Sequence, residues 1–115
     1  MKGRKGDLAR LQHIQEAILE IEKYRQNRNF IDFTSDSMFR FACIKQLEII
    51  GEASNHISDE TQQEFLDIQW AQIVGMRNIF IHEYFGVDIN IVWEIIEFDI
   101  PELKTKIIDI LEKLK

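Results

Sequence analysis

Apolar residues recur every three or four positions along most of the chain, which is the spacing of one face of an α-helix. No segment alternates apolar and polar residues as a half-buried strand would, and one proline interrupts the 115 residues. The pattern predicts an all-α protein, an antiparallel bundle of four to five helices. We expect the helices at 7–26, 35–56, 69–82, 88–98 and 103–114, with a loop at 27–34 and a polar connection at 58–67 that has room for a short helical turn.

Polar residues and the proline indicate where individual helices begin. Either Ser35 or Asp36 can cap the second helix, and Asp88 can cap the fourth. Pro101 lacks a backbone N–H, so the chain either kinks there or restarts a helix with Pro101 near its first turn. The boundaries of the C-terminal helices therefore depend on how Pro101 is accommodated.

The second predicted helix is apolar over most of its circumference. Its polar stripe is narrow and consists of Lys45, Glu48, Glu52 and Asn55. Such a helix is central, in contact with neighbours on several sides or with a second subunit. Gly51 lies in the same helix, and tight packing around a glycine is compatible with an oligomer.

Length and composition fit one soluble domain covering residues 1–115. A chain of this size buries about two-thirds of the surface that its unfolded form exposes, and no apolar run approaches the roughly 20 residues of a membrane span. The start leads into a charged amphipathic segment and not into the apolar stretch of a secretory signal. The single cysteine, Cys43, cannot form an intrachain disulfide, which fits the cytoplasm, and we expect it to pack as a small apolar side chain.

Charge is unevenly distributed along the chain, whose formal net charge is -6. Residues 1–45 hold nine Lys/Arg against six Asp/Glu, whereas residues 46–115 hold five against fourteen. The negative balance argues against broad coating of nucleic acid, because that binding depends on many phosphate contacts. A polyanion is expected to approach the N-terminal region, and a basic protein partner the acidic C-terminal half.

Arg77 is the one lysine or arginine between Lys45 and Lys104. At about 100° per residue it shares a helix face with Trp70, Val74, Ile81 and Tyr84, so its guanidinium points where apolar side chains point. An arginine in such a position needs a partner. Either Glu48 or Glu52 of the second helix can form this ion pair, and the pair can coexist with a functional role of Arg77.

His82 follows five residues after Arg77, and an imidazole titrates near neutral pH. Five residues correspond to about 140° around a straight helix, so the two side chains do not converge unaided. Either the helix unwinds near His82, or two subunits bring both residues to one cleft. Asn78 shares a face with His82 at a spacing of four residues, and its amide can orient the imidazole or a phosphate.

The segment from Arg77 to Tyr84 resembles the R-x4-H-x-Y signature of HEPN domains, and the version preceded by Trp70 and Gly75-Met76 looks like their HepT toxin branch. The resemblance covers most of the chain, from about Leu8 to Leu111. It includes Leu47-Glu48-Ile49-Ile50-Gly51-Glu52-Ala53, Val92-Trp93 and Asp99-Ile100-Pro101-Glu102-Leu103.

This resemblance implies a helical bundle that forms a homodimer, places two motifs at a shared cleft and acts on RNA as a metal-independent ribonuclease toxin without a cofactor. Arg77 and His82 would be catalytic, with Asn78 in support. The implied partner is a minimal nucleotidyltransferase of the MntA type, an antitoxin that transfers AMP to the motif tyrosine, here Tyr84.

RNA cleavage without a metal needs a base for the 2′-hydroxyl proton, an acid for the leaving 5′-oxygen and positive charge at the phosphate. His82 can be base or acid, and Arg77 can hold the phosphate by two hydrogen bonds. The alternative is a non-catalytic helical partner, in which the motif and the acidic half dock a separate nucleotidyltransferase. His13 and His56 have no chemical partners in the sequence and are expected to be ordinary surface residues.

Three histidines far apart and one cysteine give no metal-ligand spacing. The chain also lacks a glycine-rich phosphate loop, so it is not expected to be the nucleotidyltransferase itself. Without its motif, Tyr84 would be interpreted as a core aromatic residue.

Overall fold

The computed structural model describes residues 5–82 and 86–114, and for Ile79, Ile81 and His82 the backbone alone. Every regular element within these ranges is helical, which confirms the all-α prediction. In chain order the elements are α1 (Asp7–Arg25), α2 (Phe30–Ser35), α3 (Ser37–Asn55), α4 (Asp59–Glu64), α5 (Trp70–His82), α6 (Ile89–Glu94), the π-helical turn η2 (Ile95–Asp99) and α7 (Ile100–Leu114).

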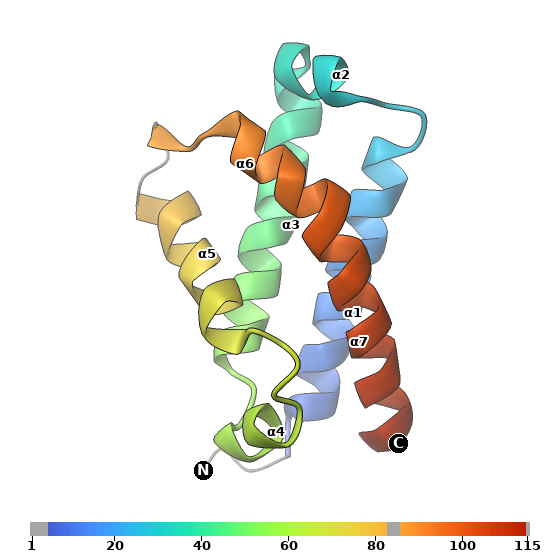
Figure 1. The fold of residues 1–115 in the computed structure, drawn as a ribbon, viewed down its shortest axis with the longest axis vertical. Helices are drawn as coiled ribbons and strands as arrows, with labels where there is room; N and C mark the ends of the chain where they lie inside the picture. The colour runs from blue at the N-terminus through green and yellow to red at the C-terminus, as the bar shows by residue number, and fades with distance from the viewer. Residues whose placement is uncertain (1–4, 83–85, 115) are drawn as a thin grey trace.

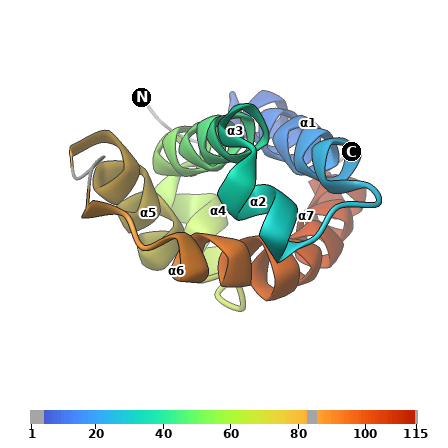
Figure 2. The ribbon, with the colours of Figure 1, turned by 90° about the horizontal axis from the view of Figure 1, so that it is seen from above.

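The long helices form an antiparallel bundle. Seen from above, α5, α3, α1 and α7 follow one another around it (Figure 2), and consecutive helices run in opposite directions (Figure 1). Accordingly α5 packs against α3, α3 against α1 and α1 against α7. The predicted bundle is therefore present, and α3 holds the central place expected from its broad apolar face.

The core lies between these helices and follows the 3.6-residue period. Helix α1 buries one stripe, and α3 and α7 supply the facing side chains. The fully buried residues include Leu11, Ile14, Ile18, Ile21, Leu47, Ile50, Ile107 and Ile110. No helix in the described ranges is long and apolar enough to cross a membrane.

Cys43 is part of this core. Its side chain has no exposed surface, and burial raises the pKa of the thiol to about 12. A thiol with that pKa carries almost no thiolate at neutral pH and is therefore a poor nucleophile. The expectation that Cys43 packs as an apolar residue is confirmed.

Local capping determines where the helices around 27–36 begin. The side chain of Asp36 accepts a hydrogen bond from the N–H of Phe39 at 3.2 Å, so Asp36 and not Ser35 caps α3. The prediction of a loop over 27–34 was wrong, because Asn29 and Asp32 form a reciprocal capping box, both bonds 3.0 Å long, that starts α2. This pattern uses Asp at the position where Glu or Gln is more usual.

Pro101 lies in the first turn of α7, but no break separates α7 from α6, because a π-helical turn connects them. The N–H of Ile100 bonds to the carbonyl of Ile95, five residues back, which makes η2 a π-helical turn. The next bond of that ladder would reach the Ile96 carbonyl from residue 101, but proline has no N–H. Helix α7 then proceeds with Pro101 as its second residue, and α6, η2 and α7 form one continuous run (Figure 1).

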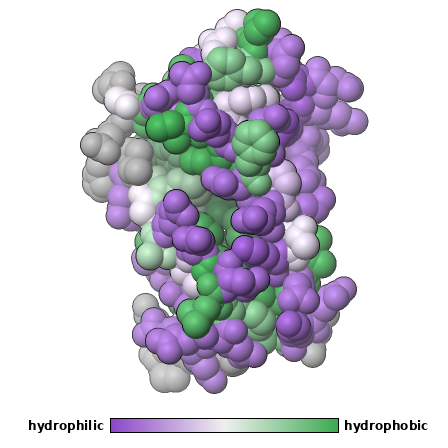
Figure 3. Space-filling model, in the orientation of Figure 1, coloured by the Kyte–Doolittle hydropathy of each residue, from purple (hydrophilic) through white to green (hydrophobic). Residues whose placement is uncertain are grey.

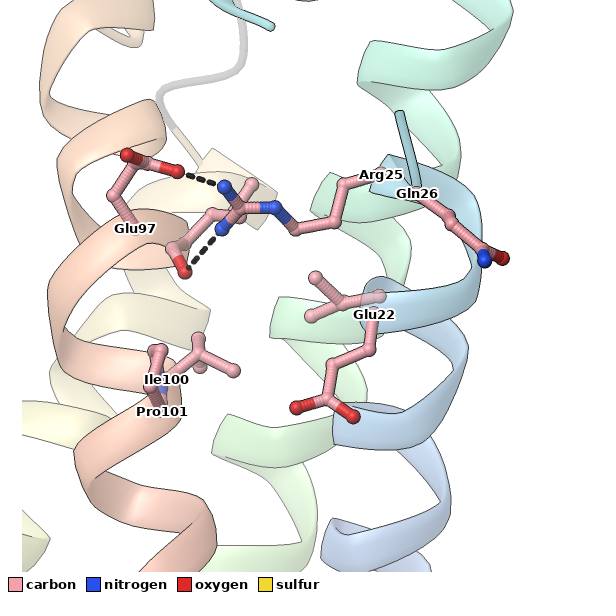
Figure 4. Close-up of a pocket in the computed structure, with 8 residues that line it drawn as sticks. Glu22, Arg25, Gln26, Glu97, Ile100 and Pro101 are labelled. Atoms are coloured by element: carbon pink, nitrogen blue, oxygen red, sulfur yellow. Dashed lines mark hydrogen bonds and ion pairs between the residues drawn. The ribbon is translucent and has the colours of Figure 1, made fainter. Parts of the chain in front are cut away.

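Arg25 donates a hydrogen bond to the Ile96 carbonyl, which receives none from residue 101 because proline has no N–H. Its Nη1 donates to the oxygen of Ile96 at 3.0 Å, and its Nη2 pairs with the carboxylate of Glu97 (Figure 4). The guanidinium also lies over the ring of Trp93, 5.0 Å from the centroid. Arg25 therefore joins the end of α1 to the π-helical turn.

A buried carboxylate joins the beginning of α1 to α4. Asp7 is 1% exposed and accepts hydrogen bonds from the backbone N–H of Ser58 at 2.9 Å, from the Ser58 hydroxyl at 2.6 Å and from the hydroxyl of Thr61. Ser58 Oγ in turn accepts from the N–H of Thr61 and caps α4. The side chain of Asp7, in the first turn of α1, thus holds the N-terminus of α4, whose capping residue Ser58 follows it by 51 residues.

Replacing Asp7 with alanine is expected to lower the free energy of unfolding by about 2–4 kcal/mol, because buried donors of Ser58 and Thr61 lose their acceptor. Urea denaturation followed by circular dichroism measures the change. Glu16→Ala, at an exposed position of the same helix, is the control and should shift stability by no more than about 0.5 kcal/mol. Equal midpoints for the two variants would show that the Asp7 network does not stabilise the fold.

Candidate active site

The motif helix α5 approaches α3 very closely at Gly51. A Cβ atom on Gly51 would lie 2.6 Å from the Cβ of Arg77 and 3.1 Å from the carbonyl oxygen of Ile73. Only glycine leaves room for this contact, because ordinary carbon contacts are near 3.5–4.0 Å. The tight packing that the sequence indicated at Gly51 is therefore accounted for within one chain, and it fixes the backbone of Arg77 against α3.

Arg77 is partly buried, with a third of its side chain exposed, and its charge is paired. Its Nε lies against a carboxylate oxygen of Glu52, so the structure selects Glu52 from the two expected partners. Glu48 instead lies 3.8 Å from the amino group of Lys45. Nη1 of Arg77 donates to the side-chain oxygen of Asn78 at 2.9 Å.

These contacts leave part of the guanidinium free with respect to the described residues. A guanidinium has five N–H donors in a planar fork. Glu52 forms an ion pair at Nε and Asn78 accepts a hydrogen bond from Nη1; among the side chains that the structure describes, these two are the polar partners of Arg77. The arginine is therefore oriented by two side chains and retains donors for an anion such as a phosphate.

His56 extends the network by one residue. Its Nε2 lies 3.0 Å from the second carboxylate oxygen of Glu52. The hydrogen bond with His56 is the largest influence that lowers the pKa of the Glu52 carboxyl, and the charge of Arg77 acts in the same direction. Because that pKa is lowered, Glu52 stays ionised as the pH falls to its ordinary carboxyl range, and its pair with Arg77 is lost only below it.

The expectation that His56 is an ordinary surface residue is therefore incomplete. The sequence does contain the relevant signal, since Glu52 and His56 are four residues apart on one helix and can meet. What the sequence does not reveal is that the carboxylate also reaches Arg77. His13 remains an exposed residue of α1, as predicted.

The other motif residues are placed by the backbone of α5. The helix extends to His82, so it does not unwind between Arg77 and His82, and the two positions stay about 140° apart around its axis. The expected pairing of Asn78 with His82 involves a side chain outside the described part of the structure. Tyr84 also lies outside the described residues.

The surface beside this network carries mixed charge. A groove of about 370 Å³ runs between α1 and α3 beside Glu52 and His56. Its charged and titratable lining residues are Arg10, His13, Glu16, Glu20, Glu52 and His56. The groove beside the ionic partner of Arg77 is therefore not uniformly cationic. In the described ranges, no group of three or more His, Cys, Asp or Glu side chains can hold a metal ion.

Comparison with known proteins identifies the family. The family model described as Ribonuclease HepT-like matches residues 14–110. The chain belongs to the HepT-like ribonuclease family. A probable ribonuclease HepT of Thermococcus cleftensis is 43% identical over 96 residues, which are 84% of this chain and 87% of that protein. No solved structure matches the chain significantly.

Two further relatives of the family carry similar names. A putative RNase of Caldanaerobacter subterraneus subsp. tengcongensis is 42% identical over 106 residues, 91% of this chain and 94% of the relative. A putative RNase of Methanocaldococcus jannaschii is 36% identical over 97 residues, 84% of this chain and 89% of the relative. The HEPN resemblance of the motif and the HepT-like family match thus agree, and both include Arg77 and His82.

Proposed function

We propose that this chain is a metal-independent endoribonuclease and the toxin of a toxin–antitoxin pair. The observation that carries the proposal is the placement of Arg77. Glu52 and Asn78 orient its guanidinium at the surface of α5, five residues before His82, in a member of a ribonuclease family. An oriented guanidinium and an imidazole on the same helix are groups suited to phosphodiester chemistry once a substrate lies between them.

In the proposed reaction, Arg77 binds the scissile phosphate and His82 takes the proton from the 2′-hydroxyl. The 2′-oxygen then forms a bond to phosphorus, and the bond from phosphorus to the 5′-oxygen breaks. The leaving oxygen receives a proton from an acid. The products are a 2′,3′-cyclic phosphate and a 5′-hydroxyl end, and the scheme requires no metal ion.

In this proposal, a homodimer brings Arg77 and His82 to one cleft. Because the backbone of α5 remains helical to His82, the positions of Arg77 and His82 in one chain lie about 140° apart around the helix axis. A two-fold pair of chains has two such motifs at one interface, so one imidazole can act as base and the other as acid. The active form is therefore proposed to be at least dimeric.

The proposed antitoxin is an MntA-type nucleotidyltransferase that acts on this protein in the cytoplasm. Tyr84 follows His82 by two residues in the sequence. An AMP group on its hydroxyl would add bulk and a phosphate charge close to the site that must bind the phosphate of RNA. Such a modification disfavours substrate binding through repulsion and steric exclusion.

The purified chain is expected to cut bulk tRNA and mRNA in the presence of EDTA as fast as in the presence of magnesium. Gel analysis of the fragments measures cutting, and enzymatic end labelling identifies the 2′,3′-cyclic phosphate and 5′-hydroxyl ends. A His82→Ala preparation purified in parallel controls for contaminating nuclease. Cutting that requires magnesium, or 5′-phosphate products, would contradict the proposed chemistry.

A second candidate is a non-catalytic partner of a nucleotidyltransferase. The observation that favours it is the charge of the groove beside Glu52, the ionic partner of Arg77, where Arg10 faces Glu16, Glu20 and Glu52. Expression of the chain alone separates the two functions: the toxin arrests growth and a co-expressed nucleotidyltransferase relieves the arrest. Harmless accumulation of folded protein would favour the non-catalytic partner.

A further inference from the structure

A second surface, which shares no lining residue with the groove beside Glu52, lies between the motif helix and the C-terminal helices. Helix α5 packs on α3, while α7 packs on α1, so a groove remains between α5 and the run from α6 to α7. Its volume is about 540 Å³. Figure 3 shows it as a hollow with apolar side chains at its base and hydrophilic ridges on both sides.

The base of the groove is apolar, and both α5 and the run from α6 to α7 contribute side chains to it. Its apolar lining residues are Ile68, Ile73, Met76, Ile91, Ile95, Ile100 and Leu103. Several of them are not covered by the fold: Ile91 is 55% exposed, and Ile73, Met76 and Ile95 are half-buried. A cluster of partly exposed aliphatic side chains in a concave surface, rimmed by polar groups, is typical of a protein interaction site.

The rim of the groove is acidic. Glu94, Asp99 and Glu102 line it. Burial is the main cause that raises the pKa of Asp99, and the charges of Glu102 and Glu94 raise it further, so these carboxylates are near enough to repel one another. Lys106 is the one cation of the lining, and it donates to the carbonyl of Asp67 at 2.6 Å and lies 3.6 Å from Glu102.

We propose that this groove binds a basic amphipathic helix of a partner protein. An apolar stripe at i, i+3, i+4 and i+7 fits between two helix walls, and lysine or arginine residues that flank the stripe face Glu94, Asp99 and Glu102. The proposal concerns the chemistry of the partner and does not depend on the ribonuclease function.

The charges of the groove favour this occupant over RNA and over a second copy of the chain. Three carboxylates with one engaged lysine repel the phosphates of RNA. A two-fold pair places the same surface on both subunits, so a dimer formed by apposed grooves would bring six carboxylates together. A cationic helix instead relieves the repulsion among the carboxylates and covers the aliphatic base.

The test uses the full chain and two synthetic peptides of about 18 residues, long enough for appreciable helicity. One carries a leucine stripe flanked by lysines, and the other the same stripe flanked by glutamates. Fluorescence anisotropy at about 0.15 M salt, where surface charges are screened beyond roughly 8 Å, measures binding. The lysine peptide is expected to bind, and its amide-shift changes in NMR spectra are expected to map to both walls of the groove.

Variants distinguish the groove from general attraction to an acidic protein. A triple variant is expected to bind the lysine peptide at least about tenfold more weakly; it combines Glu94→Gln, Asp99→Asn and Glu102→Gln. Ile91→Gln should also weaken binding of the peptide, without a change in net charge. The control combines Glu16→Gln, Asp59→Asn and Glu112→Gln, which change net charge equally at exposed positions outside the groove. Equal weakening in the two triple variants would overturn the proposal.

Two other occupants would also be revealed. A chain that is dimeric by sedimentation and becomes monomeric when Ile91 is replaced would assign the groove to a second copy and overturn the proposal. RNA that competes with the lysine peptide and shifts the same groove resonances would overturn it as well. Loss of RNA cleavage in Arg77 variants with unchanged peptide binding would show that the groove and the proposed active site are independent.

Discussion

Arg77→Ala is expected to lower the rate of RNA cleavage by about 100- to 10,000-fold, because the charge that stabilises the developing phosphorane is removed. His82→Ala is expected to lower it by a similar factor through loss of the general base or acid. Arg77→Lys should fall between wild type and Arg77→Ala, since an ammonium group cannot hold Glu52 and Asn78 and bind a phosphate with two parallel bonds. Single-turnover cleavage of a labelled RNA measures all three rates.

Two further variants show whether the loss is specific to the site. Arg28→Ala removes an exposed arginine that pairs with Asp36 at 3.1 Å, and its rate should remain within about twofold of wild type because surface pairs contribute little. Glu52→Gln keeps Arg77 but removes its ionic partner, so a smaller loss of about tenfold is expected. A folded Arg77→Ala protein that cuts RNA as fast as Arg28→Ala would exclude Arg77 from catalysis.

The positions of the long helices were predictable from the sequence because burial and capping act over a few residues, whereas the short helix α2 was missed. The period of Leu11, Ile14, Ile18 and Ile21 placed α1, and capping residues narrowed the start of α3 to Ser35 or Asp36, of which the structure has Asp36. The π-helical turn was harder to predict from the sequence. Pro101 indicates locally that the helix is disturbed there, but the donor to the Ile96 carbonyl is Arg25, 71 residues away in sequence, and no local pattern identifies it.

The proposed site also has features that the sequence predicts and features that depend on tertiary contacts. A lone arginine among apolar positions predicted that Arg77 has an acidic partner on α3, and local spacing reduced the choice to Glu48 and Glu52. The choice between them depends on the rotation of α5 against α3, which Gly51 sets through tertiary contact. The link from Glu52 to His56 was available from their spacing, but its importance appears only when Arg77 is in place. The acidic groove likewise depends on which helices are neighbours, not on any one helix.

Gly51→Ala is expected to move α5 and to lower both stability and RNA cleavage. The added Cβ would meet the Cβ of Arg77 at 2.6 Å, and neither atom can rotate away because each is attached directly to a helix backbone. Alanine gains about 0.5–1 kcal/mol in helix propensity, but overpacking costs about 1–3 kcal/mol. We expect a net loss of about 1–2 kcal/mol in the free energy of unfolding. Urea denaturation measures this value.

The displacement also reaches the proposed catalytic arginine. A shift of about 1 Å in a reacting group can cost about 100-fold in rate, so cleavage by Gly51→Ala should fall far more than stability alone would cause. The matched control is Gly75→Ala in α5, where an added Cβ meets nothing within 4 Å. Stability should then stay unchanged or rise by about 0.5–1 kcal/mol from helix propensity alone. If Gly51→Ala stabilised the protein as Gly75→Ala does, the close contact between α3 and α5 would not exist, and Gly51 would no longer explain how Arg77 is held beside Glu52.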